Sequence, residues 1–246
     1  MTTRPEIGIS DRIGLGLSII LFAVPGLALW LSTAVLLPSL IARGWQPLTA
    51  WFAAGGLVFA GLLAAAVIAA AMAAPRISPG AIAEQLRLRP MRGRDWLVGV
   101  VALVVALALT AMMYLINANF WPQLSPHPGF MQIEALKPQQ FYLLALWVPF
   151  FALNIIGEEL WWRGFIQTRQ EPVFGAGTWV LQGLLHLAFH ASFGPGVMFV
   201  LLPVVFVIPW AVQRTGNTSV GIFVHAAING PAFLALTLGL LPSGLK

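Results

Sequence analysis

The chain has 246 residues, of which 59% are hydrophobic and 9% are charged, and it contains no cysteine. A soluble domain of ordinary composition carries about 25% charged residues, so this chain has too little charge to cover a surface in water. These proportions exclude a soluble enzyme, a disordered protein and a secreted module held by disulfides. The net charge of +5 does not indicate a nucleic-acid partner, because the basic residues lie between apolar runs, where they set membrane topology.

Seven apolar segments predict an all-α fold, a polytopic membrane bundle of about seven transmembrane helices. Each segment reaches or nearly reaches the ~20 residues that a membrane-spanning helix needs. In chain order they cover residues 13–41, 49–74, 96–118, 141–167, 178–193, 197–212 and 219–241. The fifth and sixth are short and are separated by Gly194-Pro195-Gly196, so the count can range from six to eight. We interpret residues 1–246 as one integral membrane domain.

The arginines predict the orientation of the chain. The first segment is too long for a signal-peptide core, so we expect a retained anchor. With the N-terminus inside, ten Lys and Arg residues flank the inner ends of the segments and three flank the outer ends. The inner set is Arg4, Arg12, Arg76, Arg87, Arg89, Arg92, Arg94, Arg163, Arg169 and Arg214; the outer set is Arg43, Lys137 and Lys246. This bias predicts a cytoplasmic N-terminus and an outer C-terminus.

Two loops have distinct compositions. Residues 75–95 alternate apolar side chains with arginines, which fits either an amphipathic helix at the membrane interface or a solvated basic loop. Residues 119–140 contain four prolines and are expected to be irregular.

The few polar residues inside apolar segments stand out. Glu158 and Glu159 are the only acidic residues within an apolar run, and three of the four histidines, His186, His190 and His225, also lie in such runs. A charged residue in the middle of a membrane costs a few kcal/mol, so it usually faces the bundle interior and has a partner. Trp161 and Trp162, in contrast, are expected to be interfacial anchors.

The spacing of these polar residues is helical. Intervals of four place them in stripes on three helices, and Glu159 and Arg163 are close enough to pair. The stripes are Asn154 with Glu158, Glu159 with Arg163, Gln182 with His186 and His190, and His225 with Asn229. Glu158 lies ~26 Å along its helix from the outer end, and His186 and His225 lie ~10–13 Å from the inner ends of theirs. The stripes on all three helices therefore fall in the cytoplasmic half of the bilayer.

These residue types suit hydrolysis. A glutamate in a low-dielectric site can act as a general base, and a neighbouring histidine can share the attacking water. A second histidine with an asparagine can stabilise an oxyanion. With no cysteine and no serine in a nucleophile-elbow context, we expect no covalent nucleophile.

The motifs resemble those of the CPBP family of intramembrane proteases, which takes in type II CAAX prenyl endopeptidases and bacterial Abi-type bacteriocin-processing or immunity proteins. The resemblance lies in Glu158-Glu159-Leu-Trp-Trp-Arg163 and in the final His225-Ala-Ala-Ile-Asn229, with a histidine motif between them. It covers roughly residues 143–233, within a protease-like core at about 141–241. The middle motif lacks the family's usual aromatic four positions before its histidine, because Gln182 stands there.

The resemblance implies roles for six residues. Glu158 and His186 would activate the water, His225 and Asn229 would form the oxyanion site, and Glu159 and Arg163 would organise the pocket. His186 is the preferred middle histidine, and the auxiliary or alternative residues are His190, Gln182 and Asn154. No cofactor is required by this mechanism. Zinc held by Glu158, His186 and His225 remains the alternative, because two histidines and a glutamate leave an open fourth position.

The function expected is therefore endoproteolysis of a membrane-associated peptide or protein, lipidated or a leader, near the cytoplasmic face. The expected location is the inner (plasma) membrane of a bacterium, with the lipid bilayer as the surrounding partner and no nucleic acid. Two alternatives stay open: a non-proteolytic scaffold or bacteriocin self-immunity protein of the same fold, and a proton-coupled transporter. The sequence predicts no oligomeric state.

Overall fold

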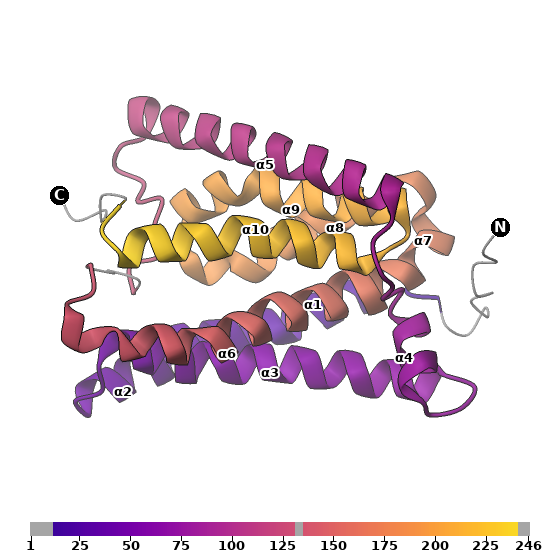
Figure 1. Cartoon of the computed structure of the whole chain (residues 1–246), viewed down its shortest axis with the longest axis horizontal. Helices are drawn as coiled ribbons and strands as arrows, with labels where there is room; N and C mark the ends of the chain where they lie inside the picture. The colour runs from indigo at the N-terminus through magenta and orange to yellow at the C-terminus, as the bar shows by residue number, and fades with distance from the viewer. Residues whose placement is uncertain (1–11, 131–134, 241–246) are drawn as a thin grey trace.

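The computed structural model describes residues 12–130 and 135–240, and every regular element in these ranges is a helix (Figure 1). The first crossing consists of α1 (Leu15–Leu31), the π-helical η2 (Ser32–Leu36) and α2 (Leu37–Ala42). The other long helices are α3 (Pro47–Ala73), α5 (Gly93–Phe120), α6 (Tyr142–Glu158) with the π-helical η4 (Glu159–Gln167), α8 (Thr178–Phe189), α9 (Pro195–Thr215) and α10 (Thr218–Thr237). The short helices are α4 (Pro79–Gln85), η3 (Pro138–Gln140), α7 (Thr168–Phe174), η5 (Gly175–Gly177) and η6 (His190–Phe193).

Each of the seven predicted segments forms a helix, which confirms the all-α polytopic bundle. Within the described ranges, six continuous helical stretches are long and apolar enough to cross a membrane. One of them, Tyr142–Phe193, has 52 residues and turns back on itself after α7, at η5 (Figure 1). Gly175 adopts a φ of +57° at this turn. The fourth and fifth predicted segments are therefore the two arms of this stretch.

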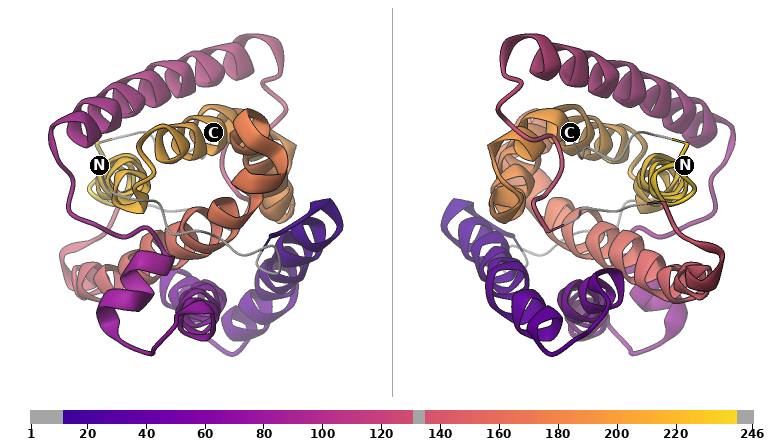
Figure 2. Two further views of the ribbon diagram at one scale, coloured as in Figure 1. Left: turned by 90° about the vertical axis from the view of Figure 1, so that its right-hand side faces the viewer. Right: turned by 90° about the vertical axis from the view of Figure 1, so that its left-hand side faces the viewer.

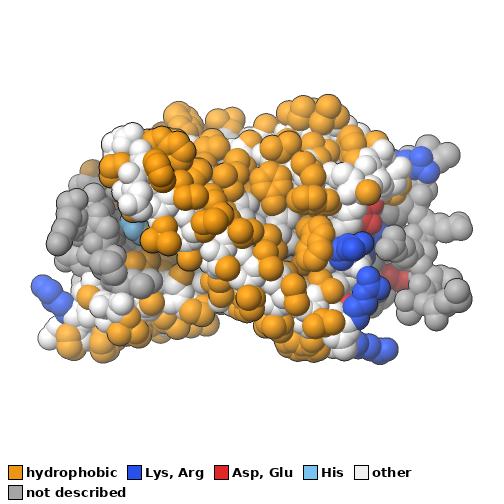
Figure 3. Space-filling view, turned by 90° about the horizontal axis from the view of Figure 1, so that it is seen from above, with side chains coloured by type: hydrophobic (Ala, Val, Ile, Leu, Met, Phe, Trp, Pro, Cys, Tyr) orange, Lys and Arg blue, Asp and Glu red, His pale blue; other side chains and the backbone are white. Residues whose placement is uncertain are grey.

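The two ends of the bundle differ in charge. We call the end that carries α4, α7 and the turn between α9 and α10 the arginine-rich end, because most Lys and Arg side chains gather there (Figures 1 and 3). The opposite end carries the turn between α2 and α3 and the loop of residues 121–130. The first described residues lie at the arginine-rich end and α10 finishes at the opposite end (Figure 1). This separation agrees with the predicted orientation, which itself stays a prediction.

Figure 2 shows the bundle along its length, with α5 on one side and α3 on the other. Helix α5 lies on one side and packs against α9 and α10, while α3 lies on the other side and packs against α6. Helix α8 packs against both α1 and α9. The polar stripes of α6, α8 and α10 face the interior of the bundle, where Glu158, His186 and His225 are buried, while α6 and α8 expose apolar residues on their other faces.

The loop of residues 75–92 closes the arginine-rich end. Its helix α4 spans only seven residues, so the amphipathic helix considered from the sequence is limited to Pro79–Gln85. The Leu86 side chain is 2% exposed, and the Leu86 carbonyl accepts a 2.6 Å hydrogen bond from the Thr218 hydroxyl. The described parts of the other loop, residues 121–130 and 135–137, are irregular as expected, and residues 131–134 lie outside the described ranges.

Helices α3 and α6 approach closely because Gly157 has no side chain. A Cβ atom at this position would lie 2.5 Å from the Phe59 carbonyl oxygen. Small residues allow such contacts between membrane helices, where van der Waals packing replaces the hydrophobic effect. Gly157 immediately precedes the acidic pair, so this contact fixes the position of Glu158 relative to α3.

We expect Gly157→Ala to lower stability, because the added methyl group must push α6 away from backbone atoms of α3. Overpacking of this kind costs about 1–3 kcal/mol. Thermal unfolding of the purified protein in detergent measures the effect. Gly61→Ala on α3 is the matched control, since a Cβ there has no neighbour within 4 Å. Equal melting temperatures for the two variants would contradict the close contact.

Candidate active site

Glu158 and Glu159 lie where the fourth crossing changes from α-helix to π-helix. Glu158 is the last residue of α6, and Glu159 is the first residue of η4, which continues for nine residues. Segments of π-helix are rare and often occur at functional sites. Both carboxylates are buried, at 2% and 0% exposure. Buried charges of this kind require hydrogen-bonding partners.

The Glu158 carboxylate is held from two sides. Its Oε1 accepts a 2.8 Å hydrogen bond from the Asn154 amide, one turn earlier on α6. Its Oε2 lies 2.9 Å from Nε2 of His186 on α8. Each oxygen of a carboxylate can accept two hydrogen bonds, so both retain the capacity to accept another.

Arg163 links the two glutamates: it contacts Glu159 directly and contacts Glu158 by way of His186. Its Nη2 lies 2.9 Å from Nδ1 of His186, and its Nη1 lies 3.2 Å from Oε1 of Glu159. A guanidinium only donates hydrogen bonds, so Nδ1 of His186 must accept. The proton of this neutral imidazole is then on Nε2, which donates to Glu158. Arg163 therefore sets the tautomer of His186.

The network continues to α10. His225 places Nδ1 2.9 Å from Oε1 of Glu159, and Asn229 places its amide nitrogen 3.1 Å from Nε2 of His225. Hydrogen bonds and one ion pair thus link seven side chains on three helical segments. In order, the chain of contacts is Asn154, Glu158, His186, Arg163, Glu159, His225 and Asn229. The six predicted catalytic residues and the auxiliary Asn154 are all in it.

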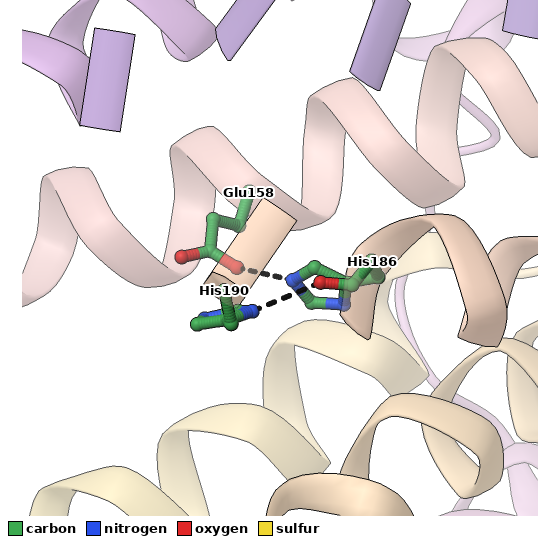
Figure 4. A group of neighbouring side chains, drawn as sticks. All are labelled: Glu158, His186 and His190. Carbon is green, nitrogen blue, oxygen red and sulfur yellow. Dashed lines mark hydrogen bonds and ion pairs between the residues drawn. The ribbon is translucent and has the colours of Figure 1, made fainter. Parts of the chain in front are cut away.

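His190 lies beside Glu158 at the start of η6. Its Nδ1 donates a 3.0 Å hydrogen bond to the His186 carbonyl, which leaves Nε2 as the acceptor nitrogen of the ring (Figure 4). Glu158, His186 and His190 each offer a potential ligand atom within 4.8 Å of the others. The structure therefore brings His190 to this group, whereas His225 of the predicted zinc set faces Glu159.

The hydrogen bonds of His186 do not fit a metal ligand. A histidine binds a metal through an unprotonated nitrogen and normally donates its other N–H to an acceptor. In His186 the nitrogen away from Glu158 faces the donor Arg163, so the nitrogen near Glu158 carries the proton. Without His186, Glu158 and His190 supply two ligands, fewer than the three of catalytic zinc sites.

Three other residues lie outside the network, and the two tryptophans among them differ from expectation. Gln182 lies outside the network and donates a 2.6 Å hydrogen bond to Gln170, so it joins α8 to α7 instead of serving the site. Trp162 is not an interfacial anchor, because it is fully buried and stacks on Phe22 at 4.1 Å. Trp161 is also buried, at 7% exposure.

Gly221 is a site residue that the sequence analysis missed. It lies one turn before His225 on α10, and a Cβ there would overlap Oε2 of Glu159. Gly221 is four residues before His225, and this spacing in the sequence already placed it on the same helix face as His225.

A cavity of about 270 Å³ begins at the network. Glu158, His186, His190, His225 and Asn229 form part of its wall. Most of the remainder is apolar, aliphatic and aromatic in equal measure, and the aromatic residues include Trp51, Phe59, Trp147, Phe150, Phe193 and Phe233. Such a cavity, apolar with a few convergent polar groups, is typical of a small-molecule or peptide site.

The fold and this network define a polytopic membrane protein with a buried acid–base site. The type II CAAX prenyl endopeptidase Rce1-like family model matches residues 140–230, which contain all seven residues of the network. This segment is therefore similar to the type II CAAX prenyl endopeptidases, the resemblance that the motifs predicted. No curated protein and no solved structure matches the chain significantly.

We expect Glu159→Ala and Arg163→Ala to lower the free energy of unfolding, because each leaves a buried charge without its partner. Breaking a buried pair in this way costs about 3–5 kcal/mol. Folded yield and thermal unfolding in detergent measure the loss. Glu84→Ala, at an exposed position of α4, serves as the control. If the two buried variants unfold like the control, the pairing of Glu159 with Arg163 is wrong.

The tautomer of His186 also predicts how the protein responds to zinc. Purified protein should hold zinc well below one ion per chain, and chelator treatment should leave its melting temperature unchanged. Elemental analysis before and after dialysis against a chelator makes the measurement. Zinc at one ion per chain, retained by the wild type and lost in His186→Ala, would contradict the assignment.

Proposed function

We propose that this protein is an intramembrane endopeptidase that hydrolyses a peptide bond with water activated by Glu158. The family is a protease family, which supports hydrolase activity at that level. The observation that carries the finer proposal is the orientation of Glu158. Its carboxylate accepts hydrogen bonds from His186 and Asn154 and lines the apolar cavity. A carboxylate so held is ionised and able to take a proton.

The reaction begins with a water molecule beside Glu158. The carboxylate takes one proton of the water while the oxygen attacks the carbonyl carbon of the substrate, forming a tetrahedral oxyanion. Glu158 then gives this proton to the leaving amine as the C–N bond breaks. In this proposal the acceptor nitrogen of His190 accepts a hydrogen bond from the second hydrogen of the water. His186 positions Glu158. The role in activating the water that was predicted for His186 is thus divided between His186 and His190.

Asn229 donates to the oxyanion in this mechanism, and His225 orients the Asn229 amide. Nδ1 of His225 faces the Glu159 carboxylate and therefore carries a proton. In the neutral ring Nε2 then accepts from the Asn229 amide, whose second hydrogen can be donated to the oxyanion. Glu159 and Arg163 hold His225 and His186 in these orientations.

The substrate is an apolar peptide segment within a membrane-associated protein. Aromatic and aliphatic side chains together line most of the cavity, and these suit apolar residues on either side of the scissile bond. Glu158 lies in the half of the bundle nearer the arginine-rich end, so with the predicted orientation the cleavage occurs toward the cytoplasmic side. The location expected from the sequence, a bacterial inner membrane, is part of this proposal.

A quenched library of leader and prenylated peptides, with the protein in detergent or liposomes, tests the proposal. We expect Glu158→Gln to lose at least 10²-fold in turnover, since general-base catalysis contributes about 10²–10⁴-fold. Glu158→Gln keeps the size of the side chain, so the variant should fold. Asn229→Ala should lower kcat more than it changes KM, because it removes an interaction of the transition state.

Glu171→Gln is the control for turnover, because Glu171 pairs with Arg87 at 2.8 Å at the arginine-rich end. Equal turnover by wild type and Glu158→Gln would contradict the role of Glu158. Absence of turnover in every form would instead favour the non-proteolytic scaffold or immunity protein.

A further inference from the structure

The cavity extends from the catalytic network in one direction. The residues four positions toward the opposite end from Glu158, His186 and His225 are Asn154 on α6, His190 at the start of η6, and Asn229 on α10. All three line the cavity and are partly exposed. The residues four positions away toward the arginine-rich end are Trp162, Gln182 and Gly221, and all three are buried. The same asymmetry thus occurs on three separate helices.

Beyond the network, the arginine-rich end is closed by packed side chains. Gln167 donates a 2.8 Å hydrogen bond to the Pro209 carbonyl, which joins η4 to α9. Gln182, Gln170 and Ser18 form a buried series of hydrogen bonds of 2.6 and 2.7 Å that joins α8, α7 and α1. These contacts leave the interior at this end filled.

The far part of the cavity wall belongs to the opposite end. Pro126, His127 and Pro128 come from the loop of residues 121–130, and Tyr114 and Leu236 come from the final turns of α5 and α10. Tyr114 is 39% exposed, and His127 is partly exposed. Burial lowers the pKa of His127, so its imidazole is neutral at pH 7 and adds no charge to this region.

We propose that the peptide substrate and the hydrolytic water reach Glu158 from the opposite end of the bundle, past the loop of residues 121–130. The nature of the molecule that enters rests on the proposed protease function, whereas the route rests only on the shape of the cavity. With the predicted orientation, the protein accepts an apolar segment from the outer side of the membrane. The scissile bond must then pass ~20 Å or more below the outer surface, because Glu158 lies 16 residues from the start of α6. A folded domain next to the scissile bond is excluded by the 270 Å³ cavity.

Single-cysteine labelling tests this route directly, because the chain has no cysteine of its own. Ala232→Cys places a thiol on the cavity wall. Lys137→Cys and Arg76→Cys provide exposed references at the opposite and arginine-rich ends. A charged, membrane-impermeant maleimide is then applied to each side of sealed vesicles. The references report which side is which, so the test does not depend on the predicted orientation.

Leu115→Cys is the matched control for depth. Leu115 is 66% exposed on α5 and lies five residues before the end of its helix, as Ala232 does on α10. A thiol in the bilayer at this depth does not meet the charged reagent, so this variant should remain unlabelled from both sides.

We expect Ala232→Cys to react from the side that labels Lys137→Cys, at least tenfold faster than from the side that labels Arg76→Cys. Labelling from the Arg76 side, equally from both sides, or from neither would overturn the proposal. The outcome needs no turnover, so a failure of the protease function is recognised separately in the peptide assay. If turnover is present, the attached label should abolish it in Ala232→Cys and leave it unchanged in Arg76→Cys.

Discussion

The Arg163 guanidinium lies between Glu159 and His186 in a part of the bundle that is closed to water. A buried cation in such a place requires an anion, and Glu159 provides it at 3.2 Å. The same guanidinium donates to Nδ1 of His186, so one interaction neutralises a charge and sets a tautomer. The positions of Glu158, His225 and the two asparagines depend on the pairing of Arg163 with Glu159 and on the tautomer of His186. Without the Arg163 contacts, His186 could rotate or protonate at Nδ1, and Glu158 would lose its orientation.

The surrounding fold serves this arrangement. The π-helix η4 carries Glu159 and Arg163 into the interior, where Trp162, stacked on Phe22, fills the space beside His186. Gly221 leaves room for the second oxygen of Glu159, and Gly157 lets α6 contact α3. These residues have no place in the chemistry, but each sets where a charged group lies. The packing also explains why the cavity extends to one end only, since the side chains that support Arg163 occupy the other.

The sequence predicted the fold and the membership of the network well, because both depend on local patterns. Apolar runs identify spanning helices, and intervals of four place polar residues on one helix face. The partners within the network were harder to predict. Arg163 was expected to serve Glu159 alone, and its contact with His186 depends on how α8 packs against η4. The place of His190 beside Glu158 has the same cause, since η6 begins at that residue. The burial of Trp162 and the need for Gly221 also arise from contacts between helices, which no spacing within one helix reveals.

The protonation of His186 tests the central claim most directly. The chain has only four histidines, so a ¹⁵N spectrum of histidine-labelled protein in detergent is simple, and His186→Asn identifies the signals of His186. The Arg163 contact predicts a neutral ring with its proton on Nε2 and an unprotonated Nδ1 at pH 7. A proton on Nδ1, in either the neutral or the charged ring, would contradict the account.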